Sequence, residues 1–260
     1  MNSFTHCTDA HVSDVDHDAD WTLLPPFCGQ AVPFRSLEQV FALRGETIGS
    51  DALSKVLRVE HRGRRYYVKR YHRAGKYLRR FVGRSRIRAE WENLLQLRRW
   101  GIATPPVVGY GERRTAQGFR GALITAELPG TLDLATLAAR DDVRLRDGAW
   151  LDRVGRQLAA ATRTLHRHGF AHNDLKWRNL LVDNNGRLSF IDCPAGRHWR
   201  GALLRYRVIK DLACLDKVAK RQLSRSRRLR FYLDYLDEPR LRRQDKTQLR
   251  KLLGFFDGRD

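Results

Sequence analysis

The stretch from His172 to Asp192 constrains what this chain can fold into more than any other. Asp174 precedes Asn179 by 5 positions, and Asn179 precedes Asp192 by 13, within apolar surroundings. An Asn-Asn-Gly turn signal between two short apolar runs predicts a β-hairpin. Its first strand, turn and return strand would span residues 180–182, 184–186 and 188–191. Such a hairpin would carry Asn179 and Asp192 to the same edge, with Asp174 on the loop before it. This arrangement is typical of a site that combines a base with metal ligands.

The charge of the chain indicates the kind of partner it meets. Its 260 residues carry a formal net charge of +21, which attracts polyanions such as nucleic acid, anionic lipid or a phosphorylated glycan. No run approaches the roughly 20 apolar residues of a membrane-spanning helix, and the N-terminus lacks the features of a signal peptide. The 4 cysteines show no paired spacing, which suits a reducing compartment. We therefore expect a cytoplasmic protein that contacts a membrane surface.

The spacing of the polar residues resembles the catalytic loop and metal aspartate of protein-kinase-like phosphotransferases, H-x-D-x-x-x-x-N followed by D-F-G. The resemblance implies that Asp174 accepts the proton of the acceptor hydroxyl and that Lys176 neutralises the transferred phosphoryl group. Asn179 and Asp192 would bind Mg²⁺, which favours oxygen ligands. His172 would have a structural role. The alternatives are a His-x-Asp on an ordinary helix-capping turn and a lysine that only faces solvent.

Residues upstream follow the order of a kinase nucleotide site. The resemblance implies that Lys69, on the second strand of a predicted hairpin, contacts the ATP phosphates and that Glu90, on a predicted helix, holds it. Gly49 lies in a degenerate version of the glycine-rich segment that covers the phosphates. Glu127 and Leu128 resemble the hinge whose backbone groups hold adenine. A solvated lysine on a strand is the alternative for Lys69.

These elements predict an α+β, bilobal protein-kinase-like fold. Residues 35–128 would form a small antiparallel β N-lobe, and residues 129–260 a mainly helical C-lobe with a basic helical C-terminus. A helix is expected over 147–168 from its apolar spacing and the glycine that follows it. Residues 1–34 would be an N-terminal tail that is partly disordered, because its first part is polar and acidic.

The chain departs from protein kinases after Asp192. Cys193-Pro194 replaces Phe-Gly, no Ala-Pro-Glu follows, and Asn173 replaces the arginine that reads activation-loop phosphate. Asp211, only 19 positions after Asp192, resembles the helix aspartate that supports the catalytic loop from below. The short segment argues against a protein kinase that is switched by phosphorylation.

The short segment, the basic surface and the phrases Arg88-Ala89-Glu90-Trp91 and Lys210-Asp211-Leu212-Ala213 resemble the lipopolysaccharide-core Kdo/heptose kinases (WaaP-type) of Gram-negative bacteria. The resemblance covers about residues 35–250 and implies Mg²⁺- and ATP-dependent phosphorylation of a heptose or Kdo hydroxyl in the inner core. The acceptor would be lipid-anchored, anionic and displayed at the cytoplasmic membrane face. A basic protein would be peripheral to the inner membrane there, since each basic residue near an anionic bilayer contributes about 1 kcal/mol.

Three other functions stay open on the sequence. A protein kinase would keep the same site but needs a peptide platform, and a small-molecule phosphotransferase needs no such basic surface. A non-catalytic polyanion-binding protein is suggested by the basic, aromatic stretch at 62–88. The argument against it is the intact set of Lys69, Glu90, Asp174, Asn179 and Asp192, so we expect no nucleic-acid partner. Basic helices at 197–251 would aid docking to membrane or glycolipid. The oligomeric state and the hydroxyl that accepts phosphate have no signal in the sequence.

Overall fold

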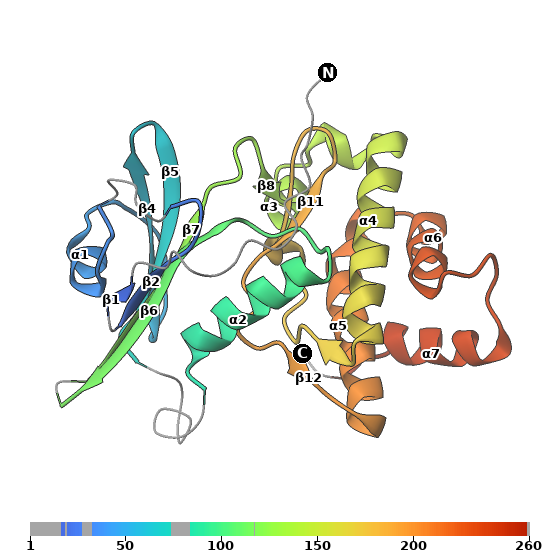
Figure 1. Cartoon of the computed structure of the whole chain (residues 1–260). Coiled ribbons are helices and arrows are strands. Elements are labelled where there is room, and N and C mark those ends of the chain that lie inside the picture. Colours follow the sequence, from blue (N-terminus) through green and yellow to red (C-terminus); the bar gives the residue numbers. More distant parts are fainter. Residues whose placement is uncertain (1–16, 19, 28–32, 74–83, 117, 259–260) are drawn as a thin grey trace. The chain divides into compact units, whose positions relative to one another are not determined.

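Figure 1 shows a computed structural model of the chain. It describes residues 17–18, 20–27, 33–73, 84–116 and 118–258. The chain divides into two compact units. The first comprises residues 1–81 and 106–127, and the second residues 82–105 and 128–260. Each unit has its own hydrophobic core.

The first unit is built on an antiparallel sheet with the strand order β1-β2-β6-β7-β5-β4-β3. Its strands are β1 (His17–Asp18), β2 (Trp21–Leu23), β3 (Glu46–Ser50), β4 (Ser54–His61), β5 (Arg64–Tyr71), β6 (Val107–Thr115) and β7 (Gly118–Ala126). The predicted hairpin that carries Lys69 is confirmed as β4 and β5, where Lys69 is paired with Val56 on one side and Leu123 on the other. Along β4 and β5, buried residues tend to alternate with less buried ones, as expected for a sheet with one face on the core.

The N-terminal segment differs from the prediction for it. Trp21 and Leu23 of β2 are almost fully buried, and Phe27 and Phe34 also belong to the core of the first unit. Gly109 makes this possible, because a Cβ there would lie 2.7 Å from the Trp21 ring. Part of the predicted tail is therefore a structural strand of the sheet. Residues 1–16 lie outside the described part of the chain.

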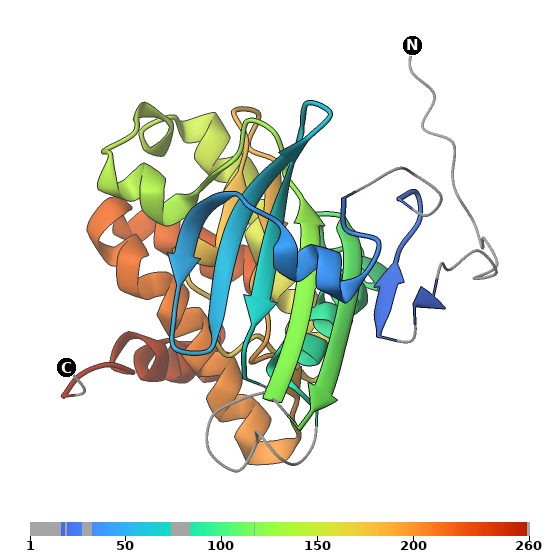
Figure 2. The ribbon, with the colours of Figure 1, turned by 90° about the vertical axis from the view of Figure 1, so that its left-hand side faces the viewer.

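Helix α1 (Leu37–Ala42) packs on one face of this sheet (Figure 2). Ser36 begins it, since its side chain accepts a hydrogen bond from the backbone N–H of Gln39. The sequence allows a helix or a strand here. The helix forms because Leu37 and Val40, one turn apart, both reach the core.

The second unit is mainly helical. Its helices are α2 (Arg86–Arg99), α3 (Leu134–Ala139), η2 (Val143–Leu145), α4 (Gly148–Arg167), η3 (Trp177–Asn179), α5 (Gly201–Gln222), α6 (Arg225–Leu236) and α7 (Arg243–Leu253). Its strands are β8 (Leu132–Asp133), β9 (Phe170–Ala171), β10 (Leu180–Val182), β11 (Leu188–Phe190) and β12 (Arg197–His198). Strand β10 lies between β11 and β8, and β12 pairs with β9. The predicted hairpin is confirmed, with Leu180 opposite Phe190.

Helix α4 forms where its pattern predicts. Asp147 caps it by accepting hydrogen bonds from the backbone of Ala149 and Trp150, and Gly169 follows it with φ of +66°. Val154, Leu158 and Leu165 of its apolar face are buried in the core of the second unit. Among the described residues, no helix has the length and apolar character needed to cross a membrane. The predicted class, an antiparallel N-terminal sheet followed by a mainly helical part, is confirmed.

Candidate active site

The predicted catalytic loop follows β9 and is held from below by Asp211 of α5. The backbone N–H of His172 donates to Asp211 Oδ2 at 2.7 Å, and that of Asn173 donates to Oδ1 at 2.9 Å. Asp211 is completely buried. The expected support of the loop by Asp211 is therefore present in the structure. Two charge-assisted hydrogen bonds inside the protein fix the backbone just before Asp174.

Asn173 occupies the position that an arginine holds in protein kinases and makes a different set of contacts. Its Nδ2 donates to the carbonyls of Ala171, at 3.1 Å, and Ala195, at 2.9 Å. The backbone carbonyl of Asn173 accepts a hydrogen bond from Nζ of Lys210 at 3.3 Å. Its φ is +63°, a left-handed conformation that asparagine tolerates better than most residues. Asn173 thus joins the catalytic loop to the segment after Asp192.

His172 is fully buried, and burial lowers the pKa of its imidazole. Neither ring nitrogen has a hydrogen-bond partner among the described residues. The sequence predicts that His172 has a structural role and supports the hydrogen bonds of the loop. In the structure its backbone N–H does so, while the ring fills space beside Phe190.

Asp174 is surrounded by cationic and amide groups. Lys176 Nζ lies 2.6 Å from Oδ1 and Arg178 Nη2 3.4 Å from Oδ2. Asn179 Nδ2 donates to the Asp174 carbonyl at 2.9 Å and lies 3.3 Å from Oδ2. Burial raises the pKa of Asp174, but the hydrogen bond and charge of Lys176, helped by Arg178, outweigh burial and leave the pKa below its usual value. The carboxylate is therefore ionised and able to accept a proton.

Asn179 and Asp192 lie at the open end of the β10–β11 hairpin. The backbone N–H of Ile191 donates to the Asn179 carbonyl at 3.0 Å, which places the two predicted metal ligands on neighbouring backbone. Asp192 has φ of +56°, a left-handed conformation that aspartate adopts more readily than most residues. Asn179 donates through Nδ2, and its Oδ1 accepts no hydrogen bond in the described part of the chain. This oxygen is therefore available to a ligand. An amide oxygen and a carboxylate suit Mg²⁺, which takes few protein ligands and completes its shell with phosphate and water.

Metal-binding clusters of another kind are not found in the described ranges of the chain. The described residues contain no group of three or more His, Cys, Asp or Glu side chains that could hold an ion. A dedicated all-protein metal cage is therefore absent from that part of the chain. The oxygen pair of Asn179 and Asp192 is the donor set that fits a nucleotide-bound ion.

A contact that the sequence reasoning missed comes from α2. The buried Nδ2 of Asn93 donates to the carbonyls of Cys193, at 2.7 Å, and Gly196, at 2.9 Å. Gly196 allows the turn to close, because a Cβ there would lie 2.4 Å from the Phe170 ring. A polar residue on the buried side of an apolar helix pattern was the available signal. Asn93 fixes the turn that carries Asp192.

The predicted nucleotide residues are distributed over both units. Gly49 lies in β3 beside a bulge, and Lys69 lies in β5, with Nζ 5.6 Å from the centre of the Tyr71 ring. Glu90 is buried in α2 of the second unit, at 4% exposure. The expected pairing of Lys69 with Glu90 stays a prediction. So do the exact boundaries of the two predicted lobes.

The predicted hinge lies at the junction of the two units. Within the first unit, the Glu127 backbone N–H donates to the Arg65 carbonyl at 2.9 Å, and its carboxylate lies 3.4 Å from both Arg65 Nη1 and the Tyr67 hydroxyl. In the second unit, the Leu128 carbonyl accepts from Thr131 Oγ1 at 2.8 Å. The role of Glu127 and Leu128 in holding adenine stays a prediction.

Comparison with known proteins decides the family. The model of the lipopolysaccharide kinase (Kdo/WaaP) family matches residues 38–235, which include every predicted site residue.

The chain belongs to the lipopolysaccharide kinase (Kdo/WaaP) family.

A solved structure of a family namesake agrees with this assignment. The structure, described as WaaP in complex with acyl carrier protein, is 29% identical, with a TM-score of 0.65, and the match covers 85% of this chain and 90% of that chain. No curated protein matches this chain. The resemblance to the Kdo/WaaP kinases and the kinase-like fold predicted from the sequence are both confirmed.

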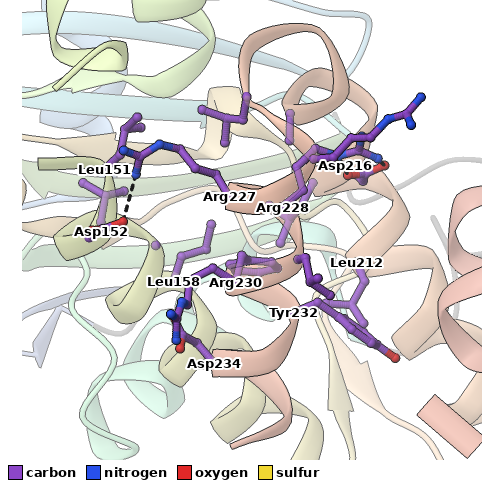
Figure 3. Close-up of a pocket in the computed structure, with 18 of the residues that line it drawn as sticks. Leu151, Asp152, Leu158, Leu212, Asp216, Arg227, Arg228, Arg230, Tyr232 and Asp234 are labelled. Carbon is purple, nitrogen blue, oxygen red and sulfur yellow. Dashed lines mark hydrogen bonds and ion pairs between the residues drawn. The ribbon is translucent and has the colours of Figure 1, made fainter. Parts of the chain in front are cut away.

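This Kdo/WaaP family member also has an apolar cavity whose lining includes neither Asp174 nor Lys176 (Figure 3). It has a volume of about 610 Å³ and lies among α4, α5, α6 and α7. Leu158, Leu212 and Tyr232 are part of its apolar wall. Arginines of α6 line it as well, and ion pairs join Arg227 to Asp152 and Arg228 to Asp216. Its size and apolar lining are those of a small-molecule site.

Proposed function

We propose that this chain is an ATP- and Mg²⁺-dependent kinase that phosphorylates a heptose or Kdo hydroxyl of the lipopolysaccharide inner core. Membership of a lipopolysaccharide kinase family supports this function. The observation that carries the chemistry is the ionised Asp174, held between Lys176 and Arg178 on a loop fixed by Asp211. Phosphoryl transfer needs an aligned acceptor oxygen and neutralised charge, and these residues supply both.

Asp174 would accept a hydrogen bond from the acceptor hydroxyl and take its proton as the new bond forms. Lys176 is bonded to Asp174 before substrate arrives, so its ammonium group is already near the reacting centre. We infer that it neutralises the transferred phosphoryl group. Both charges are in place beforehand, which reduces the reorganisation needed during the reaction.

Asn179 Oδ1 and the Asp192 carboxylate would hold Mg²⁺, which supplies charge neutralisation on the nucleotide phosphates when bound. Asn93 keeps the turn after Asp192 in place through its two hydrogen bonds. We further propose that Lys69, Glu90 and Gly49 contact or support the phosphates, and that the backbone of Glu127 and Leu128 holds adenine.

We propose that the reaction takes place on the cytoplasmic face of the inner membrane of a Gram-negative bacterium. A lipid-anchored acceptor that already carries anionic groups would be displayed there. The net charge of +21 supports a peripheral association with such a surface.

The test compares core oligosaccharide from cells that carry the wild-type gene, no gene or Asp174→Asn. Mass spectrometry should find one phosphate fewer per core in the last two, because the variant loses the base. In a purified system, Asp174→Asn should lower kcat by at least about a hundredfold while the protein stays folded. A folded variant with the turnover of the wild type would remove Asp174 from the mechanism.

We also propose that this chain binds an acyl carrier protein. The similar solved structure holds WaaP with that partner, and an apolar cavity suits an acyl chain. Gly155 of α4 lines the cavity, and a Cβ at this position would meet no atom within 4 Å. A larger side chain can therefore be introduced there to probe the cavity.

Native mass spectrometry of the chain with acylated and unacylated carrier protein tests this partner. Gly155→Phe should fill part of the cavity and weaken binding of the acylated form, whereas Gly155→Ala should leave it unchanged. Equal binding by the two variants would place the acyl chain elsewhere.

A further inference from the structure

The N-terminal half of α5 leaves large apolar side chains partly exposed. Leu203 is 59% exposed and Tyr206 is 43% exposed. They are three positions apart on one helix and therefore share a face. Single exposed hydrophobic residues are common on protein surfaces, but adjacent ones indicate an interaction surface.

Aromatic and arginine side chains surround these two residues. Arg197 and Arg207 lie over the Trp199 ring, with Cζ at 5.4 Å and 4.6 Å from its centre. Arg207 Cζ is also 5.5 Å from the centre of the Tyr206 ring, which itself lies 5.6 Å from the Phe255 ring. We call this set the basic aromatic patch: Arg197, Trp199, Leu203, Tyr206, Arg207 and Phe255.

The patch is built from the same elements that hold the catalytic loop. Strand β12, which contains Arg197, pairs with β9 immediately before His172. Trp199 is anchored by its backbone N–H, which donates to the Gly169 carbonyl at 2.8 Å. Helix α5 runs from the patch to Asp211, about 12 Å along its axis from Leu203. The patch and the catalytic loop are therefore rigidly connected.

The charge around the patch has one sign. Residues 193–210 contain no Asp or Glu, and their basic residues are Arg197, Arg200, Arg205, Arg207 and Lys210. Tyrosine favours the membrane–water interface, where its apolar ring and its polar hydroxyl are both satisfied. Arginines extend toward lipid phosphates while their stems cover apolar surface.

We propose that the basic aromatic patch is a membrane-contact surface, which inserts Leu203 and Tyr206 among the lipids of an anionic bilayer. The inference that the partner is a bilayer rests on the proposed function. Contact through this surface places the catalytic loop one short helix segment from the bilayer. An acceptor sugar that is anchored in the same bilayer then meets Asp174 without leaving the membrane.

The experiment measures binding of the full chain to phosphatidylcholine vesicles with and without phosphatidylglycerol. Wild-type protein should bind the anionic vesicles. Leu203→Glu should weaken that binding by about tenfold or more, since the side chain no longer enters the apolar layer. Val143→Glu is the matched control: it places the same charge at a site that is 74% exposed and lies outside the patch. It should bind like the wild type.

Three results would overturn the proposal: no binding by the wild type, unchanged binding by Leu203→Glu, or an equal loss in Val143→Glu. A thermal melt checks that both variants are folded, and Leu203→Gln repeats the test without a charge. Vesicle binding requires neither ATP nor acceptor. Failure of the proposed kinase chemistry would therefore leave this result intact, and absence of vesicle binding would leave the kinase chemistry intact.

Discussion

At the scale of single residues, the site depends on how Asp174 is charged. Two opposed effects set its pKa. Burial raises the pKa, and the positive charges of Lys176 and Arg178 lower it by more than burial raises it. The ordinary value is 3.8, so the carboxylate is ionised at every pH at which the protein would work. Lys176 and Arg178 also tie the loop together through their ion pairs with Asp174. Catalysis and loop stability are therefore linked through the same ion pair.

Removing Lys176 should reverse the shift. In Lys176→Ala, burial outweighs the distant Arg178, so the pKa of Asp174 should rise relative to the wild type. The stability that the ionised Asp174 contributes is fully present above pH 3.8 and is lost as pH falls through its lowered folded pKa. NMR titration of the Asp174 carboxyl carbon measures the change directly. Lys176→Arg keeps the charge and serves as the control. An unchanged titration in Lys176→Ala would mean that another group lowers the pKa.

At the scale of secondary-structure elements, α6 is held to its neighbours by arginines. The sequence predicts that the basic helices over 197–251 dock on a membrane or glycolipid. In the structure, Arg228 instead binds Asp216 of α5 through two hydrogen bonds of 2.6 Å, and Arg227 binds Asp152 of α4 at 2.9 Å. These two arginines therefore hold α6 to α4 and α5, and the docking of the basic helices stays a prediction.

Breaking the Arg228–Asp216 pair should destabilise the second unit. Both side chains are only 20% exposed, so removing one partner leaves the other poorly solvated. Arg228→Ala should lower the free energy of unfolding by about 1–3 kcal/mol, measured by chemical denaturation. Arg230→Ala, on the same helix, is the comparison. A double-mutant cycle with Asp216→Ala should give a clear coupling energy, and a coupling near zero would show that the pair adds nothing.

At the scale of the whole molecule, the short segment between Asp192 and Asp211 limits which acceptors can bind. It makes β12 and a turn, and then enters α5 at Gly201. Such a segment leaves little backbone for a peptide to lie along. A glycan that projects from a lipid needs no such platform, so the segment favours a sugar acceptor.

Competition between acceptors checks this expectation. With labelled ATP, the protein should transfer phosphate to core glycolipid and leave mixed peptides unlabelled. Raising the salt concentration should increase the KM for the glycolipid and barely change the KM for ATP, because surface charges are screened over about 8 Å at physiological salt. Efficient peptide labelling with none on glycolipid would favour a protein kinase.

The sequence predicts the parts of this fold that depend on local patterns. The β10–β11 hairpin and α4 follow from turn residues and periodicity, and the support of the loop by Asp211 follows from the resemblance to kinases. The burial of Trp21 could not be predicted in this way, since it depends on the glycines of β6, far away in the chain. The contact of Asn93 with residues 193–196 is equally non-local. An isolated asparagine in a helix gives no sign of which backbone it will meet.

The bridge from Asn93 has a consequence for inhibitor design. Helix α2 and the turn after Asp192 belong to one unit and are joined by a buried amide. Compounds that work by expelling that turn from its position must break both hydrogen bonds, at about 0.5–1.5 kcal/mol each, and leave buried polar groups unpaired. Ligands shaped to the turn as it stands avoid that penalty. Screening libraries for this enzyme should therefore favour compounds that recognise the resting conformation of the Asp192 turn.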